Sequence, residues 1–285
     1  MVTTRFAIAS TSPDSASAIP PAPPLRRHGP SPPPTGFIGH ISSTLGRYKS
    51  VLATTDADRD AACRLRFHVF NAELGEGLIQ SYATGRDRDK FDQVCDHLIA
   101  KNTQTNLVVG TYRMQSGPVA AAHFGYYSQQ EFEFAPYEPM RHQTLELGRA
   151  CIHKDHRNSE VLTLLWRTIA TYCRFHGLRY LIGCSSLTSR DPSQGWELYH
   201  QLQNFLAATQ LRTTVLPDYQ LPLRGDHSST HVKIPKLLRT YIGAGARICS
   251  QPAWDRDFGT IDFLTLLDLN QLAPAARNRF ITSPR

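Results

Sequence analysis

The residues best placed to do chemistry lie in the segment 144–152, TLELGRACI, where Glu146 and Arg149 interrupt the apolar alternation of a buried strand. A polar turn, HKDHRNSE, follows directly and leads into residues 161–170, which have the apolar spacing of a helix. A helix N-terminus binds phosphate groups, and a carboxylate beside it can take a proton from a nucleophile. This combination is suited to moving an acyl group from a phosphopantetheine thioester to an amine.

Glu146 is the candidate general base for such a transfer. An amine attacks a thioester only when it is neutral, so a nearby group must accept its proton. Leu145 and Leu147 flank Glu146 and should partly desolvate the carboxylate, which raises its pKa. An alternative stays open: Glu146 pairs with Arg149 or Arg113 inside the sheet and serves a structural or substrate-orienting purpose.

The spacing of Glu146 and Arg149 calls for an irregular strand. In a regular strand these two side chains point to opposite faces of the sheet. Gly148 lies between them and suits a β-bulge, which brings both side chains to one face and turns backbone N–H groups towards a thioester carbonyl. We therefore predict a bulge at Leu147–Gly148.

A mixed sheet must position these groups. Apolar residues at helical spacing, with Gly75 as a stop, predict a first helix from about Asp58 to Leu74. The further expected elements are a strand ending near Ala100, a returning strand at 107–114, the strand 144–152, a helix at 160–176, a strand at 178–187 and a helix-rich stretch at 193–209. The crossover helix makes the strands on either side of it parallel. We predict an α+β or mixed α/β fold.

The composition restricts the classes of partner. The 285 residues carry a formal net charge of +7, which favours an acidic partner, and no nucleic-acid-binding motif occurs. No apolar run has the length of a membrane span, and no secretory signal begins the chain, so we expect a cytoplasmic protein. The six cysteines form no C-x-x-C pair, so we expect no metal site and no disulfide.

Several motifs together resemble the acyltransferases of the GNAT superfamily, in the subgroup of bacterial L-ornithine N-acyltransferases and haemolysin-like proteins. The matching segments are LRFHVFNAELG (65–75), FD (91–92), DH (96–97), VGTYR (109–113), YSQQEF (127–132), ELGRACIH (146–153), LLW (164–166), YLIGCSSL (180–187) and blocks within 235–258. The resemblance implies a mostly antiparallel sheet with one parallel strand pair, flanked by helices.

This resemblance also divides the chain. Residues 1–45 form a Pro/Ser-rich leader that we expect to be disordered, 46–272 form the GNAT-like domain with a helical C-terminal extension, and 273–285 form a tail. The wider relatives include acyl-homoserine-lactone synthases and N-acyl amino acid synthases. They carry a charged set similar to Arg66, Asp92, Arg113, Glu146 and Arg149, but the tryptophan that follows their first helix has no counterpart here.

The turn before the crossover helix bears on the acyl donor. Members of the fold that bind coenzyme A usually have an arginine followed by glycines in this turn, whose N–H groups surround a pyrophosphate. Here the turn has no glycine, and Arg157, Asn158 and Ser159 are the candidates for binding a single phosphate. We therefore expect no tightly bound cofactor and the acyl-phosphopantetheine of acyl carrier protein as donor.

The acceptor implied by the resemblance is ornithine. Arg113 and Arg149, on core strands, are candidates for binding its carboxylate, with pairing to Asp92, Asp96 or Glu146 as the alternative. Arg66, Asp92 and Asp96 complete the predicted substrate-binding set, and Asp92, Asp96 and Glu131 are candidates for a cationic side chain. The mixed basic and apolar stretch 233–247 fits a packed surface helix, with contact to an anionic membrane as the alternative.

The resulting hypothesis is an N-acyltransferase that moves a 3-hydroxy fatty acyl group from acyl carrier protein to the α-amine of ornithine and yields a lyso-ornithine lipid. Two alternatives remain. One is the same chemistry on another amine, such as glycine or glutamine, or a lactone-forming synthase. The other is a membrane-binding, haemolysin-like protein without catalysis.

Overall fold

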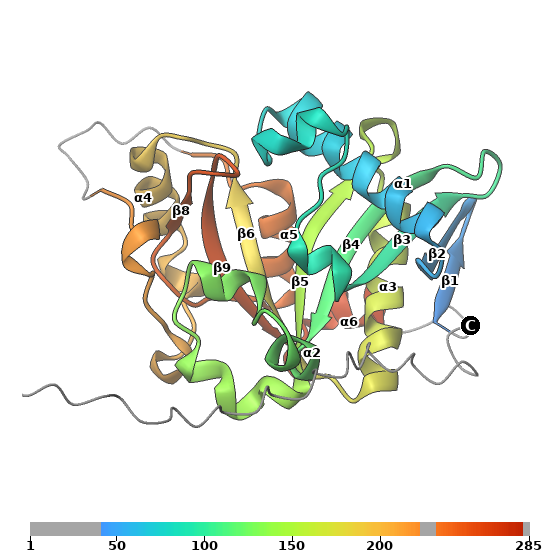
Figure 1. The fold of residues 1–285 in the computed structure, drawn as a ribbon. Helices are drawn as coiled ribbons and strands as arrows, with labels where there is room; N and C mark the ends of the chain where they lie inside the picture. Colours follow the sequence, from blue (N-terminus) through green and yellow to red (C-terminus); the bar gives the residue numbers. More distant parts are fainter. Residues whose placement is uncertain (1–40, 223–231, 282–285) are drawn as a thin grey trace, which may run out of the picture. The chain divides into compact units, whose positions relative to one another are not determined.

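In the computed structural model, the described residues 41–222 and 232–281 build a nine-stranded sheet (Figure 1). The strands are β1 (Ser42–Leu45), β2 (Tyr48–Leu52), β3 (Asp96–Asn102), β4 (Val108–Ser116), β5 (Thr144–Ile152), β6 (Tyr180–Leu187), β7 (Arg247–Ile248), β8 (Ala253–Asp255) and β9 (Thr260–Asp268). They follow the order β1-β2-β3-β4-β5-β6-β9-β7, and β8 pairs with β9. Only β5 and β6 pair in parallel among these strands, which confirms the predicted mixed fold.

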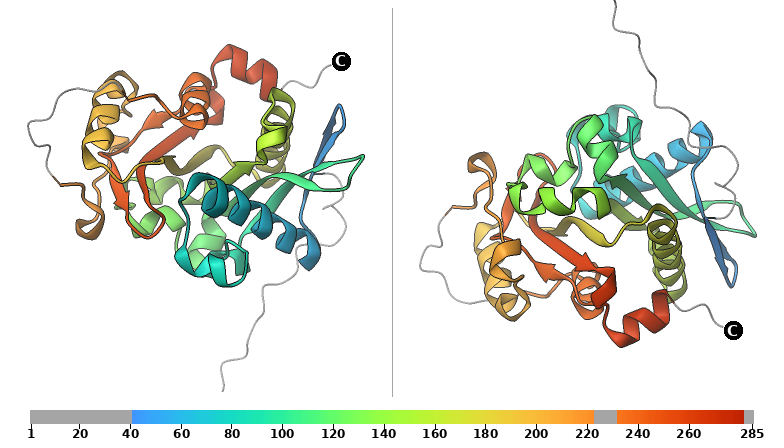
Figure 2. Two further views of the ribbon diagram at one scale, coloured as in Figure 1. Left: turned by 90° about the horizontal axis from the view of Figure 1, so that it is seen from above. Right: turned by 90° about the horizontal axis from the view of Figure 1, so that it is seen from below.

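Helices cover both faces of the sheet. They are α1 (Asp56–Phe67), α2 (Gly117–Ala122), α3 (Ser159–His176), α4 (Pro192–Gln201), α5 (Lys236–Ala244) and α6 (Pro274–Phe280). Figure 2 shows α1 on one face and α3, α5 and α6 on the other. Within the described ranges, no helix combines the length and the apolar character needed to cross a bilayer.

Local sequence signals set the ends of the principal helices. Asn158 caps α3 by accepting hydrogen bonds from the Glu160 and Val161 N–H groups, and Gly177 ends it in the left-handed conformation that glycine adopts without strain. The first helix continues past α1 as a π-helix, His68–Leu74, which ends at left-handed Gly75. The predicted helix near 58–74 and the predicted crossover helix are therefore both present.

The predicted domain limits need adjustment at both ends. Residues 1–40 of the expected leader lie outside the described residues, but β1 begins at Ser42, before the predicted boundary at 45. At the other end, α6 lies inside the stretch assigned to a tail. The prediction of a helical C-terminal extension is also incomplete, because this part of the chain contains the long strand β9, which lies between β6 and β7 in the sheet. Eight of its nine residues are buried, so its sequence TIDFLTLLD lacks the clean alternation of a one-sided strand.

The packed-helix interpretation of the stretch 233–247 is confirmed for α5. Leu238 is buried in one apolar cluster, and Ile242 packs against the same cluster. Tyr241 packs against the cluster that contains Trp166, and its hydroxyl forms a 2.7 Å hydrogen bond with that of Tyr112. These contacts tie α5 to the face of the sheet that α3 covers.

The parallel strands β5 and β6 pair only where they begin. Their register runs from Thr144 opposite Tyr180 to Glu146 opposite Ile182, and beyond these residues the strands diverge (Figure 1). At the point of divergence, a Cβ on Gly183 would lie 2.2 Å from the Leu147 carbonyl oxygen, so this close approach requires glycine. A pocket lies at the divergence, lined among others by Leu147, Trp166, Cys184 and Tyr241.

Candidate functional site

A β-bulge in β5 brings Glu146 and Arg149 to one face of the sheet. The bulge lies at Arg149–Ala150, opposite Tyr112, and not at the predicted Leu147–Gly148. Arg149 adopts the left-handed conformation with φ 48°. The extra residue reverses the alternation after Gly148, so the shared face predicted for Glu146 and Arg149 is correct although the bulge lies further along the strand.

The packing on either side of β5 confirms this arrangement. Leu145 is part of the apolar cluster under α3, and Leu147, Ala150 and Ile152 pack against that cluster. Cys151 belongs instead to the cluster with Leu65, Val69, Phe70 and Phe258 on the opposite face. Glu146 and Arg149 therefore point towards the α1 side, where polar side chains collect.

Glu146 is held by the start of the 3₁₀-helix Tyr127–Gln130. The Tyr127 N–H donates to Glu146 Oε2 at 2.7 Å, and the Ser128 N–H donates to Oε1 at 2.8 Å. The Ser128 hydroxyl also donates to Oε1. Among the described residues, no ion pair forms between Glu146 and Arg149 or Arg113, so the alternative of a direct ion pair is not realised.

The Glu146 carboxyl is 5% exposed, and this burial raises its pKa above the usual value for glutamate. The hydrogen bonds from Ser128 and Tyr127 and the charge of Arg113 act in the opposite direction, because they favour the ionised form. Oε1 accepts two of these hydrogen bonds and Oε2 accepts one, so Oε2 still has an acceptor position for an incoming proton. A buried carboxyl with a raised pKa and a free acceptor position is suited to accept a proton.

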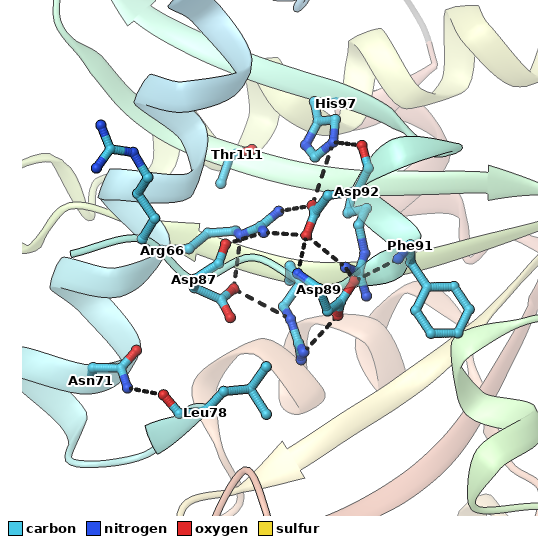
Figure 3. Close-up of polar contacts among 12 residues, drawn as sticks. Arg66, Asn71, Leu78, Asp87, Asp89, Phe91, Asp92, His97 and Thr111 are labelled. Atoms are coloured by element: carbon cyan, nitrogen blue, oxygen red, sulfur yellow. Dashed lines mark hydrogen bonds and ion pairs between the residues drawn. The ribbon is translucent and has the colours of Figure 1, made fainter. Parts of the chain in front are cut away.

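Three arginines and three aspartates form a buried ion-pair network on the same face of the sheet as Glu146. Figure 3 shows its three aspartates, Asp87, Asp89 and Asp92, together with Arg66. Arg66 pairs with Asp87 and Asp92, with a distance of 2.8 Å to each carboxylate. Arg113 pairs with Asp89 at 2.6 Å, and Arg149 lies 3.1 Å from Asp89 and 3.3 Å from Asp87. Their formal charges cancel, which makes this burial tolerable.

The charges inside this network are well defined. The guanidinium groups of Arg66 and Arg113 outweigh the effect of burial and hold the pKa of Asp92 far below its usual value. His97 Nε2 lies 3.5 Å from Asp92 Oδ1, yet burial lowers the pKa of His97 to about 4, so the imidazole is neutral at pH 7. Figure 3 shows Asp92 between Arg66 and His97.

Aromatic rings cover the arginines of the network. The guanidinium carbon of Arg149 lies 4.8 Å from the centre of the Tyr127 ring and 4.3 Å from that of Phe258. The same atom of Arg113 lies 5.4 Å from the Tyr127 and Phe91 rings. This cation–π stacking fixes the planes of both guanidinium groups at the edge of the site.

The predicted substrate-binding residues separate into two groups. Arg66, Arg113, Arg149 and Asp92 meet in the network next to Glu146. Asp96 does not belong with them: its Oδ2 accepts a 2.7 Å hydrogen bond from Tyr172 on α3, and it lies on the other face of the sheet. Asp96 is therefore corrected to a position outside the site, since it begins β3 with its side chain towards α3.

The predicted phosphate-binding residues already have partners. Arg157 contacts Glu73 with both of its terminal nitrogens, one of them at 2.7 Å, and donates from Nε to the Ile152 carbonyl. Asn158 Oδ1 accepts hydrogen bonds from the Glu160 and Val161 N–H groups, and Ser159 is the first residue of α3. The turn therefore presents positive side chains around a capped helix N-terminus.

Sequence reasoning missed several residues of the site. Asp87 and Asp89 come from the run RDRD at 86–89, whose alternating charges resemble a solvated loop. Tyr127 and Ser128 act through their backbone N–H groups, which carry no side-chain signal. Cys184 and Asp262 were also missed. They lie with Glu131, which the sequence predicts as a candidate for a cationic side chain, and ligand atoms of the three are within 4.8 Å of one another, a separation that could hold a metal ion.

No cysteine of the described chain has the surroundings of a nucleophile. All six are free thiols, and burial raises the pKa of Cys151 and Cys184 well above the usual value. A covalent acyl-cysteine route therefore lacks an activated thiolate. Direct attack of an amine on a thioester, with Glu146 as proton acceptor, fits these side chains better.

Comparison with known proteins agrees with this geometry. The Acetyltransferase (GNAT) domain family matches residues 65–167. The L-ornithine N(alpha)-acyltransferase of Brucella abortus is 31% identical and covers 85% of this chain and 94% of its own length. The enzyme of the same name from Rhodobacter capsulatus is 28% identical and covers 81% of this chain and 93% of its own.

Among solved structures, FeeM, an N-acyl amino acid synthase from uncultured soil microbes, matches with a TM-score of 0.50 and 12% identity. The match covers 83% of this chain and 97% of FeeM, and at this identity it concerns the fold alone. The buried carboxylate at the divergence of two parallel strands, the GNAT domain match and the full-length relatives agree: the chain belongs to the L-ornithine N(alpha)-acyltransferase family of the GNAT superfamily.

Proposed function

We propose that this N-acyltransferase transfers a 3-hydroxy fatty acyl group from acyl carrier protein to the α-amine of ornithine and so forms a lyso-ornithine lipid. The observation that carries the proposal is the buried Glu146, held by Tyr127 and Ser128 where β5 and β6 diverge. The relatives named L-ornithine N(alpha)-acyltransferase support the acceptor.

The proposed reaction is a direct transfer. The neutral amine attacks the thioester carbonyl carbon, a C–N bond forms, and the C–S bond breaks. Glu146 takes the proton that the amine nitrogen loses, and the departing phosphopantetheine thiolate is protonated in turn. Among the described residues, Glu146 is the carboxylate that lies at the strand divergence, faces the arginine network and pairs with no cation.

The acceptor's carboxylate would bind at the edge of the arginine network. Arg149 and Arg113 present stacked guanidinium groups on the same face as Glu146. Their pairing with Asp87 and Asp89 fixes both guanidinium groups in place, which suits the recognition of a carboxylate.

Acyl carrier protein is the proposed donor because of the turn before α3. Asn158 caps two N–H groups there and no glycine is present, so a pyrophosphate would lack the free backbone donors it needs. Lys154, Arg157 and Arg47 lie in or next to this turn and could bind a single phosphate. The net charge of +7 also favours an acidic carrier protein.

Contact with an anionic membrane surface is part of the proposal, since the product is a lipid. Lys233, Arg239 and Arg247 are exposed on and beside α5. Basic residues near an anionic surface each contribute about 1 kcal/mol to binding.

The test is incubation of the purified protein with 3-hydroxyacyl carrier protein and a panel of amino acids, with products followed by mass spectrometry. N-Acylornithine is the expected product, and Glu146→Gln should abolish it. Acylation of glycine or glutamine instead would overturn the acceptor, and transfer only from acyl-coenzyme A would overturn the donor. Binding to lipid vesicles without any acyl transfer, unchanged in Glu146→Gln, would favour a non-catalytic protein.

A further inference from the structure

A second group of acids lies on the same face of the sheet as Glu146 but outside the arginine network. Glu131 is 1% exposed and Asp262 is 3% exposed, and their carboxylates converge with the Cys184 thiol, with ligand atoms within 4.8 Å of one another. Cys184 Sγ donates to Glu131 Oε1 at 3.7 Å. We refer to Glu131, Cys184 and Asp262 as the acid cluster.

The acid cluster differs from the network in its charge balance. In the part of the chain that the structure describes, no lysine or arginine forms an ion pair with Glu131 or Asp262. Glu131 Oε2 and Asp262 Oδ1 are buried without any hydrogen-bond partner. Buried polar atoms are normally satisfied, so an unpartnered oxygen on each of two neighbouring buried acids indicates a missing donor.

Neutral hydroxyls of Ser186 and Thr260 act on Asp262 and favour its ionised form, but the charged groups around the acid cluster supply no cationic donor. Asp255 Oδ1 accepts from the Phe258 N–H at 2.8 Å, and its Oδ2 accepts from the Tyr127 hydroxyl at 3.2 Å. Glu76 adds a further negative charge near Asp262, and Arg149 acts on Glu131 without contacting it. The ion pairs of Arg149 are with Asp87 and Asp89 and not with the acid cluster.

The acid cluster is connected to Glu146, the proposed base, through the residues that follow Ser128 and through β6. Glu131 N–H donates to the Ser128 carbonyl, one turn after the residue that holds Glu146. Cys184 lies two residues beyond Ile182, the register partner of Glu146, so it is on the same face and about 7 Å further along β6. Ser186 is opposite Asp262 in the β6–β9 register and is exposed, so the cluster borders on solvent.

We propose that the acid cluster is the subsite for the side-chain ammonium group of the amino acid acceptor. This inference rests on the proposed function and extends it. With the α-amine at Glu146 and the carboxylate at Arg149, the three-methylene side chain of ornithine runs along the face of β6 towards Glu131 and Asp262. The δ-ammonium then donates to Glu131 Oε2 and Asp262 Oδ1.

A metal ion is a poorer occupant for the same atoms. The acid cluster offers three ligands, and one of them is a thiol whose pKa is raised well above its usual value by burial and by Glu131 and Asp262. Thiol ligands bind metals as thiolates. An ammonium group needs only the carboxylate oxygens and leaves the thiol protonated.

The test compares ornithine with norvaline, which has the same carbon chain without the δ-amine. In wild-type protein we expect a strong preference for ornithine in kcat/KM. Asp262→Asn and Glu131→Gln should each lower the ratio of ornithine to norvaline by about tenfold or more, with norvaline acylation changed by less than about threefold. Asp257→Asn, which removes a carboxylate from the exposed neighbouring turn, should leave the ratio unchanged.

A second measurement on the wild-type protein is independent of any variant. Burial and Asp255 raise the pKa of Asp262 to about 7, so this carboxyl is partly protonated near pH 7, and burial also raises the pKa of Glu131 well above its usual value. Binding an ammonium group there releases protons, which calorimetry in buffers of different ionisation enthalpy detects. Ornithine should release protons, and norvaline should not.

The outcomes separate the two proposals. Acyl transfer to ornithine with an unchanged preference in both variants, or with no ligand-linked proton release, overturns the subsite and leaves the proposed function standing. Proton release on ornithine binding without acyl transfer supports the subsite and overturns the function. A stoichiometric metal ion that is lost in Asp262→Asn overturns the subsite in favour of a metal site.

Discussion

Glu146 and Arg149 share one face of the sheet although the two residues between them would place them on opposite faces of a regular strand. The extra residue at the Arg149–Ala150 bulge, with Arg149 at φ 48°, reverses the alternation. The proton acceptor and the guanidinium group thereby come from one short segment, with Gly148 between them. The bulge thus determines the spacing of the site, and the helices behind β5 hold it in place.

Removing the Ser128 hydroxyl should move the acid limb of the pH–activity profile to higher pH. This hydroxyl donates to Glu146 Oε1 and favours the ionised carboxylate, so Ser128→Ala should raise the pKa of Glu146 further. A hydrogen bond to a charged group contributes about 1.5–3 kcal/mol and one pKa unit corresponds to about 1.36 kcal/mol, so we expect a shift of about one to two units. The profile of kcat/KM against pH measures it. An unmoved limb with lowered activity at every pH would exclude Glu146 as the titrating base.

Substitution of two glycines at the strand divergence should affect the stability of the protein to different degrees. A Cβ on Gly183 would lie 2.2 Å from the Leu147 carbonyl oxygen, whereas a Cβ on Gly148 would meet nothing within 4 Å. Gly183→Ala should destabilise the protein by about 1–3 kcal/mol, as overpacked core sites do. Gly148→Ala should leave the melting temperature unchanged.

The open space at Gly148 gives a further expectation for the same position. It lies between Glu146 and Arg149, where the reacting groups would meet. Gly148→Val should therefore fold like the wild type but lose most acyl transfer, measured as kcat/KM beside thermal unfolding. Full activity in Gly148→Val would show that the substrates lie elsewhere.

Much of the framework could be predicted because its signals are local. Gly75, Asn158 and Gly177 define helix ends through backbone conformation and capping, and the α3 crossover forces β5 and β6 to be parallel. β9 was missed because it is buried on both faces and therefore has no alternation.

The site was harder to predict because its contacts join distant segments. Asp87 and Asp89 come from a loop whose charge-rich composition is typical of a surface, yet Asp87 is fully buried against Arg66. Proximity in sequence predicts that Asp96 lies with Asp92, whereas β3 turns the Asp96 side chain to Tyr172. Which face a strand residue occupies depends on register, and one residue of shift reverses it.

Two arginines of α1 should differ sharply in their contribution to stability. Arg66 is fully buried between Asp87 and Asp92, whereas the Arg64 side chain is 63% exposed and pairs with Asp60. Arg66→Met removes the 2.8 Å partner of two buried carboxylates, which keep only the longer contacts to Arg113 and Arg149, and should cost about 3–5 kcal/mol. Arg64→Met should cost less than about 1 kcal/mol. Urea unfolding measures both, and equal effects would mean that water or a rearranged Arg113 compensates for the loss.

The stability of the unliganded protein should fall as the pH rises towards 8, because of Asp262. Burial and Asp255 raise the pKa of its carboxyl from 3.8 to about 7, so between these values the folded state binds a proton that the unfolded state has lost. This contribution is complete below pH 4 and disappears as the pH rises through about 7, and the difference corresponds to about 4 kcal/mol. The side chain introduced by Asp262→Asn cannot ionise, so this variant should flatten the dependence of unfolding free energy on pH between 5 and 8.

Ornithine should stabilise the wild type more at pH 8 than at pH 5, since its ammonium group compensates the ionised carboxylates. A stability curve in which Asp262→Asn and the wild type stay parallel over this range would mean that Asp262 does not titrate there.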